Sequence, residues 1–409
     1  MNRGGRQSGL SLAEFAARLR LVDHHVHGAF RGPLTRTAFE ESLNEGSTGP
    51  VPSGTTSFDS QLGFAVRRWC APLLGLPAHA PADDYWRQRA LLGEQEAAAR
   101  LLPAAGVDRW IVDTGYGGDL LLSPAELAGA AGGTAYEVVR LEALAESLAA
   151  SMAAEGATSG RGYADAYRDL LRQAAAAGAV GLKTVVAYRA GLDLDWSAPD
   201  PDAVRRAAGG WLARCAAEPA GEPGGPAGAG TGGAQQEGPR LTDPVLLRFG
   251  VHCAVEMGLP LQIHTGLGDR DLDLHRADPM LLLGLLRQPA VAAVPVMLLH
   301  CYPYHRQAGY LAQAFDRVYC DVGLAVNHLG ARSAAVVAES MELAPFGRLL
   351  YSSDAWGPAE LHVLGAALWR RAAAAAAQSW VDAGDWSEPD ARRVLTMIGR
   401  DNALSAYGL

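Results

Sequence analysis

The chain has 409 residues, of which 49% are hydrophobic, and its 35 Lys and Arg against 44 Asp and Glu give a formal net charge of −9. The basic residues form no cluster and no apolar run reaches about 18 residues, which argues against a nucleic-acid partner and a membrane-spanning segment. The N-terminus lacks an apolar secretory core and the five cysteines lack paired spacing, so we expect a cytoplasmic enzyme with reduced thiols and a small-molecule substrate, with association into a homo-oligomer left open.

The first predicted elements are a short helix and a strand. Ser11 and Glu14 have the spacing of a capping box, which predicts that a helix begins there. The following strand runs from Leu21 into His25 and His27. Residues separated by one position along a strand point to the same side, so both imidazoles can bind one metal ion.

The middle of the chain alternates between predicted strands and helices. Residues 28–105 are too long for an ordinary connection, and we expect them to form a lid-like helical insertion. Residues 219–239 are rich in Gly, Ala and Pro, and we expect a disordered loop there. Strands are predicted over Val107–Asp113, Tyr136–Leu141 and Arg317–Val322, and helices over Asp202–Ala217 and Asp243–Met257.

Four further polar residues each stand at or just beyond the end of a strand-like run: Lys183, His264, His300 and Asp354. Neutral imidazoles suit zinc, manganese or nickel, and a carboxylate adds the negative charge that an all-histidine site lacks. The alternative for Asp354 is a helix N-cap, and the alternative for Lys183 is an ion pair with Glu142 or with a substrate carboxylate. Because Asp354 ends an apolar strand-like run, we prefer the ligand.

These residues, in the order His-x-His, Lys, His, His, Asp, give the chain a resemblance to the amidohydrolase superfamily and, within it, to amidohydrolase family 2. Residues 181–189, 263–269 and 300–305 are similar to the branch linked to glutamine-synthetase-like proteins. The resemblance implies an α/β fold, a (β/α)8 TIM barrel with a helical insertion after strand 1, formed by residues 1–409 as a single domain. It also implies a divalent-metal site, with one or two ions and zinc as the first choice, whose ligands are His25, His27, Lys183, His264, His300 and Asp354.

The function that the resemblance implies is hydrolysis of an amide or related bond in a small carboxylate-bearing molecule, such as an amino-acid-derived amide. Asp354 would move the proton between the attacking water and the leaving group. In the two-metal branch of the superfamily Lys183 would be carboxylated and His300 would be a ligand. In the mononuclear zinc decarboxylases of the family His300 would instead be a catalytic acid. The third hypothesis is a barrel that binds a metal ion without being an enzyme.

Substrate contacts are expected from polar residues beyond the strand ends. Arg189, together with Arg140 and Glu142, could hold a substrate carboxylate. Asp269 lies in the loop after His264, and His305 follows His300 closely enough to orient a substrate. His24 is expected to face away from its two histidine neighbours.

Overall fold

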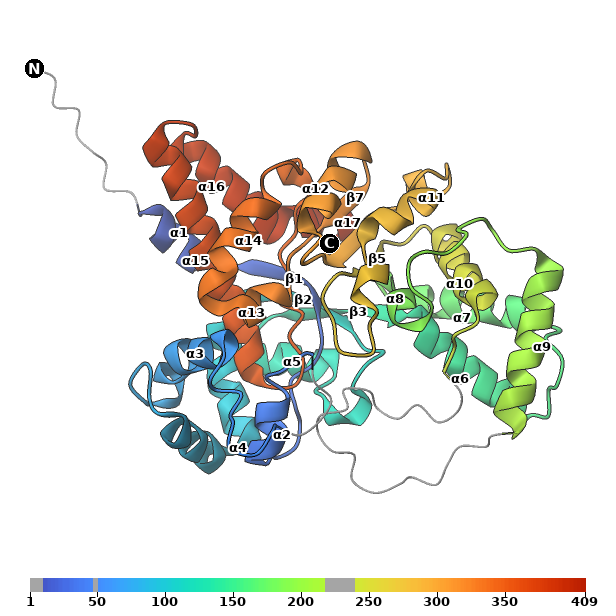
Figure 1. The fold of residues 1–409 in the computed structure, drawn as a ribbon, viewed down its shortest axis with the longest axis horizontal. Helices are drawn as coiled ribbons and strands as arrows, with labels where there is room; N and C mark the ends of the chain where they lie inside the picture. The colour runs from blue at the N-terminus through green and yellow to red at the C-terminus, as the bar shows by residue number, and fades with distance from the viewer. Residues whose placement is uncertain (1–9, 47–50, 218–239) are drawn as a thin grey trace, which may run out of the picture.

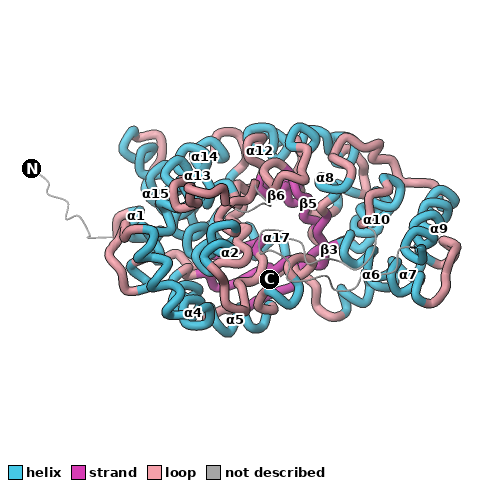
Figure 2. Tube along the Cα trace, turned by 60° about the horizontal axis from the view of Figure 1, so that its bottom comes forward, coloured by secondary structure: helices cyan, strands magenta, loops and turns pink. Residues whose placement is uncertain are grey.

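The computed structural model describes residues 10–46, 51–217 and 240–409, so the loop expected over 219–239 lies outside the described residues. Its centre is a curled sheet of seven parallel strands in sequential order, with the helices outside it (Figures 1 and 2). The strands are β1 (Leu21–Val26), β2 (Val107–Asp113), β3 (Thr134–Arg140), β4 (Gly181–Thr184), β5 (Leu261–Thr265), β6 (Val296–His300) and β7 (Val318–Cys320).

An eighth strand was expected over residues 348–353, and no strand is assigned to them. Their backbone nevertheless bonds to both edges of the sheet. The Leu350 amide donates to the Cys320 carbonyl of β7 (3.0 Å), and the His24 amide of β1 donates to the Tyr351 carbonyl (3.2 Å). The two edge strands are therefore joined through an irregular segment.

The helices follow the expected alternation with the strands. The structure confirms the capping box at Ser11, and the helices expected on both sides of residue 230 begin and end within one residue of prediction. The helices are α1 (Leu12–Arg18), α2 (Arg36–Glu41), α3 (Gln61–Ala65), α4 (Ala82–Ala104), α5 (Pro124–Ala131), α6 (Leu141–Ala154), α7 (Tyr163–Ala176), α8 (Val186–Arg189), α9 (Pro201–Ala217), α10 (Pro244–Met257), α11 (Leu283–Leu286), α12 (His305–Ala314), α13 (Ala325–Leu329), α14 (Ser333–Ser340), α15 (Ala359–Ala383), α16 (Glu388–Thr396) and α17 (Asn402–Tyr407). No helix of the described part of the chain is long and apolar enough to cross a membrane.

Two strand ends differ from prediction. β3 ends at Arg140, and Glu142 lies in the first turn of α6, because the Leu-, Ala- and Glu-rich sequence that follows has high helix propensity. β7 ends at Cys320, since the Asp321 carboxylate accepts a hydrogen bond from the Gly323 amide (2.7 Å) and turns the chain away from the sheet.

Within the insertion over residues 28–105, the described residues form helices α2, α3 and α4, as expected. Its longest helix, α4, is fixed to α15 by a buried ion pair: the Arg89 guanidinium donates to Glu360 (2.8 Å), which also accepts from the Tyr85 hydroxyl (2.9 Å). Arg89 also pairs with Glu94. Burial of this group of charges is favourable only because each member has a partner. Movement of the insertion as a lid stays a prediction.

A small second core fills the inside of the curled sheet. It joins side chains of β1, β2, β3 and β6 to α17, whose Tyr407 is almost fully buried. The Gln262 amide donates to the Tyr407 hydroxyl (2.7 Å), so the aromatic ring packs while its polar end is bonded. α17 therefore closes the sheet interior on the side away from the polar strand ends.

We expect Tyr407→Ala to lower the free energy of unfolding by about 3–5 kcal/mol, because it removes a buried aromatic ring from the sheet interior. Tyr407→Phe keeps the ring and loses the bond from Gln262, and should cost about 1 kcal/mol. Urea unfolding followed by circular dichroism measures both. Equal losses in the two variants would show that the ring contributes nothing beyond its hydroxyl.

Burial of His362 in α15 is expected to make the free energy of unfolding depend on pH. Its ring is fully buried edge-on to Trp110 (centroids 5.5 Å apart), and neither ring nitrogen has a hydrogen-bond partner among the described residues. Burial lowers the pKa of His362 to about 3, and the charge of nearby His27 adds to this effect. The unfolded chain binds a proton near pH 6.5, so it holds more protons than the native chain between pH 6.5 and pH 3.

Stability should therefore fall with decreasing pH below about 6.5, with His362 contributing up to about 1.4 kcal/mol per pH unit. We expect His362→Asn, which cannot titrate there, to flatten the dependence when unfolding free energies at pH 7 and pH 5 are compared. Identical slopes for the two proteins would contradict a buried neutral His362.

Candidate metal centre

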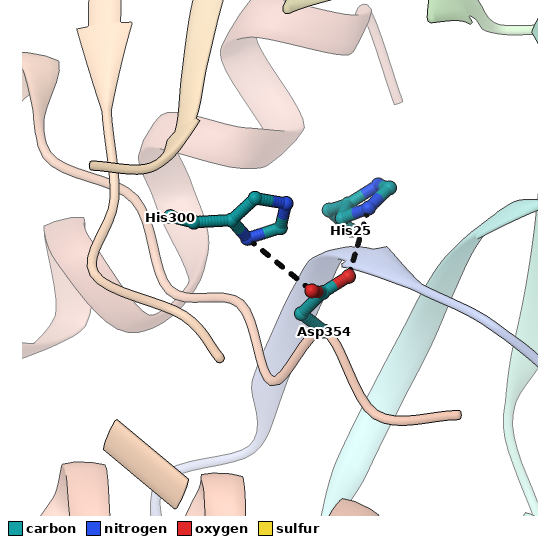
Figure 3. Close-up of side chains that lie close together, drawn as sticks. All are labelled: His25, His300 and Asp354. Atoms are coloured by element: carbon teal, nitrogen blue, oxygen red, sulfur yellow. Dashed lines mark ion pairs between the residues drawn. The ribbon is translucent and has the colours of Figure 1, made fainter. Parts of the chain in front are cut away.

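Three side chains from distant parts of the chain meet where the strands end (Figure 3). His25 Nε2 lies 3.0 Å from Asp354 Oδ1, and His300 Nδ1 lies 3.4 Å from Asp354 Oδ2. His27 Nε2 is 3.5 Å from Asp354 Oδ1. All four residues are buried, so one carboxylate is surrounded by three imidazoles with little access to solvent.

The backbone turns sharply at the two later members of this cluster. Asp354 has φ of 49° and His300 has φ of 67°, in the left-handed region that non-glycine residues rarely adopt. Neighbouring bonds hold both conformations. The Asp354 amide donates to the His25 carbonyl (3.1 Å), and the His300 amide donates to Asp321 (3.1 Å). The turns aim both side chains at the cluster centre.

The donor set fits a divalent metal ion. His27 Nδ1 is 3.0 Å from the Asp113 carbonyl; a bond donated there leaves the lone pair of His27 Nε2 facing the cluster, which is how ligating imidazoles are usually oriented. Buried His300 Nδ1 and Asp354 Oδ1 have no hydrogen-bond partner among the described residues. Unpartnered buried polar atoms are costly, and an ion between them would satisfy them.

The protonation states also suit a metal. Burial lowers the pKa of His25 to about 4, and the charge of Lys183 contributes. Burial likewise holds the pKa of His300 well below its ordinary value. Burial alone would raise the pKa of Asp354, but His300 and the adjacent His25 hold it well below the usual range. The cluster therefore offers neutral imidazoles at His25 and His300 and an ionised carboxylate at Asp354.

Lys183 lies beside this cluster, in β4. Its Nζ is 3.0 Å from His25 Nε2 and 3.5 Å from Asp113 Oδ2. Burial lowers the pKa of the Lys183 ammonium, although the charge of Asp113 opposes this shift. Lys183 is close enough to the imidazoles to act as a ligand once deprotonated, and it already has an ion-pair partner when protonated.

Asp113 was not among the residues expected at the site. It ends β2, and its Oδ2 accepts two hydrogen bonds from Arg140, at 3.1 Å from Nε and 2.5 Å from Nη2. The sequence signal for Asp113 was its position at the end of a predicted strand, which it shares with the expected ligands. Together with His25 and His27, Asp113 forms a second group of residues with metal-ligand spacing.

The remaining expected residues are placed as follows. His264 lies behind His300, with the ring centroids 4.5 Å apart. Glu142 accepts bonds from the Thr184 hydroxyl (2.5 Å) and the Val185 amide (3.1 Å), so one of its oxygens holds the turn after β4.

Two of the expected substrate contacts are bound to other side chains. Arg189 forms a buried ion pair with Glu146 (3.1 Å), and His305 bonds to Glu339 (2.8 Å). Asp269 lies beside Tyr188, whose hydroxyl is 3.3 Å from the Asp269 amide. His24 faces away from the cluster, as expected, and bonds to Asp321 (2.9 Å).

A buried histidine and aspartate cluster at the strand ends of a curled parallel α/β sheet defines a class of candidate metal-dependent enzymes. Residues 143–409 match the amidohydrolase family, which is more than half of the chain. The chain therefore belongs to amidohydrolase family 2, as its motifs predicted.

Known relatives agree with this assignment. Protein fluG of Emericella nidulans is 32% identical over 247 residues, which make up 58% of this chain and 26% of that relative. A crystal structure from Lactobacillus casei ATCC 334, of a presumed metal-dependent hydrolase, superposes with a TM-score of 0.79 at 24% identity, over 98% of each chain. Uronate isomerase from Thermotoga maritima gives a TM-score of 0.58 at 13% identity, over 97% of this chain and 96% of that one. The two structures show that the fold is shared.

The two groups of candidate ligands share His25, which gives a test of where an ion binds. Both oxygens of Asp113 are already bonded, one to Arg140 and one to the Gly115 amide (2.9 Å). We expect His25→Ala to lose its transition metal and Asp113→Asn to keep about one ion per chain, because amide substitution leaves the cluster around Asp354 intact. Elemental analysis after growth in zinc-supplemented medium measures this. A loss of metal in Asp113→Asn equal to that in His25→Ala would place the ion at the other group.

Proposed function

We propose that the protein is a metal-dependent hydrolase that cleaves the amide bond of a small molecule with an activated water. One observation carries the proposal: the Asp354 carboxylate is buried within 3.0–3.5 Å of imidazole nitrogens from His25, His27 and His300. Residues 349–354 would then serve as the eighth strand of a (β/α)8 barrel. The whole of residues 1–409 is proposed to act as one catalytic domain.

His25, His27, His300 and Asp354 would hold the ion, with zinc preferred by the nitrogen-rich donor set and manganese or nickel as substitutes. A bound divalent ion supplies a water whose pKa is lowered to about 7 and polarises the carbonyl of the substrate. The protein's own part is to hold four donors at fixed positions and to keep bulk water out of the cluster.

Asp354 is the group proposed to move the proton. One of its oxygens faces the imidazoles of β1, and the other faces His300 of β6. The carboxylate would accept the proton of the attacking water at one oxygen and return it to the leaving nitrogen. Such a positioned base typically contributes about 10²–10⁴-fold to the rate.

The protonation state of Lys183 would decide whether the site binds one metal ion or two. As a neutral amine Lys183 could attack carbon dioxide and lose a proton, and the resulting carbamate could hold a second ion, which favours hydrolysis; as an ammonium it stays paired with Asp113. The second case favours the mononuclear decarboxylase chemistry also proposed for this family, with His300 as the acid. Intact-mass analysis of the metal-loaded protein distinguishes a carboxylated Lys183 from a free amine.

We expect Asp354→Asn to keep most of its metal and to lose roughly 10²-fold or more in turnover, because the amide keeps one oxygen ligand but cannot take up a proton. Asp271→Asn, in an exposed turn, is the matched control and should be unchanged. The assay follows amine release from a panel of amides, with metal content measured on the same samples. Near wild-type turnover by metal-loaded Asp354→Asn would rule out this proton path.

His300→Asn separates the two mechanisms. If His300 is a metal ligand, the variant should lose metal and turnover together. If His300 is a catalytic acid, the variant should stay loaded with metal and be inactive. The decarboxylase alternative is supported only by the second outcome, combined with release of carbon dioxide from a carboxylic acid substrate.

A further inference from the structure

Five side chains from separate loops form a rim beside the metal cluster. We call this set the acidic-aromatic rim: Glu45 after α2, Tyr116 after β2, Tyr188 in α8, Asp269 after β5 and Trp356 before α15. All five are partly buried. None of them except Asp269 was expected from the sequence to contact a substrate.

Two of the aromatic members lie against histidines near the strand ends. The Tyr116 ring lies 5.3 Å from the His27 ring and 5.6 Å from the Trp356 ring. The Tyr188 ring lies 4.6 Å from the His264 ring. Aromatic faces and edges therefore surround the space next to the cluster, and rings in such an arrangement attract a cation that comes within about 6 Å.

The acidic members form no ion pair with a lysine or arginine of the described chain. The charges of Arg240 and Arg270 act on Asp269 from a distance, and Trp356 donates a hydrogen bond to Glu45. Burial raises the pKa of Glu45 to about 8, and the charges of Asp354 and Asp269 add to the shift. A carboxyl group with this pKa is largely protonated at neutral pH, and a positive charge placed between Glu45 and Asp269 would favour its ionised form.

Two of the basic side chains near the rim are already paired with carboxylates. Arg140 packs over the Tyr116 ring at 5.4 Å, but both of its bonds go to Asp113. Arg189 is paired with Glu146. A substrate carboxylate would have to displace one of these buried ion pairs, whereas a substrate cation meets two carboxyl groups that form no ion pair among the described residues.

A buried, unpartnered nitrogen also points into this space. His264 is 4% exposed, and its Nε2 has no hydrogen-bond partner among the described residues. A Cβ atom on Gly268 would lie 3.1 Å from His264 Nε2 and only 2.0 Å from the Tyr188 hydroxyl, so only glycine lets the loop of Asp269 come this close. The loop of Asp269 therefore packs directly against His264 Nε2, which has no hydrogen-bond partner among the described residues.

We propose that the acidic-aromatic rim binds an alkylammonium group of the substrate, held between Glu45 and Asp269 and against the rings of Tyr116, Tyr188 and Trp356. This inference rests on the proposed function, since it names the substrate class of the same site. The bond that is cleaved then lies in a molecule with a positively charged group near the amide.

Binding is tested with two probes that differ only in charge, n-pentylammonium and 1-pentanol, titrated into the zinc-loaded protein by calorimetry. We expect the ammonium to bind at least about tenfold tighter. Glu45→Gln and Asp269→Asn should each abolish most of this preference. The matched controls Glu41→Gln in α2 and Asp271→Asn in the loop of Asp269 should keep it.

Hydrolysis supplies an independent readout. N-(4-aminobutyl)acetamide should be cleaved with a kcat/KM about tenfold above that of N-butylacetamide, and Glu45→Gln should equalise the two. If neither amide is cleaved but the binding preference holds, the proposed hydrolysis fails and the cation site stands. Equal affinity for the two probes, or an ammonium preference that survives in both rim variants, overturns the inference.

Discussion

The hydrogen bond from the Asp354 amide to the His25 carbonyl is the contact on which the rest of the site depends. It joins the first strand of the sheet to the irregular segment that follows β7, and so brings together two residues that are far apart in the sequence. It also holds Asp354 in a backbone conformation that costs about 1–3 kcal/mol by itself. Without this bond the carboxylate would not face the imidazoles of β1.

Asp321 supports the same region from the opposite side of the sheet. One of its oxygens accepts from the His300 amide and from the Ser352 hydroxyl (2.9 Å), while the other bonds to His24. A single buried carboxylate thus ties β1, β6 and the closing segment together below the metal cluster. The strained turns at the strand ends can persist because this network determines them more strongly than local preference does.

Most of the cluster could be predicted because strand periodicity and strand ends fix where side chains point. His25 and His27 follow the strand periodicity. His300 and Asp354 stand at the expected strand ends, although left-handed backbone turns aim their side chains. The pairing of Arg189 could not be predicted, since its partner Glu146 lies on a helix whose packing is decided by tertiary contacts. The segment before Asp354 was predicted as a regular strand, but its backbone turns at the last residue to reach the cluster.

Glu45 was missed for a different reason. It stands in a loop with no periodicity, and nothing in the local sequence indicates that the loop reaches the strand ends. The folded chain brings Glu45 close enough to Asp269 and Asp354 for their charges to raise its pKa, although the three residues are far apart in the sequence. Sequence patterns thus identify the part of a site that is built on strands better than the part that is built on connections.

The order in which the cluster residues occur along the chain has a kinetic consequence. An unfolded chain offers only the local pair His25 and His27, whereas the complete donor set exists after the sheet has closed against Asp354. Contacts over such sequence separations form slowly, so closure is expected to precede tight capture of an ion. An ion that binds only the native chain raises its apparent melting temperature with free metal concentration. The steady-state amount of this protein in a cell would thereby follow the supply of the metal.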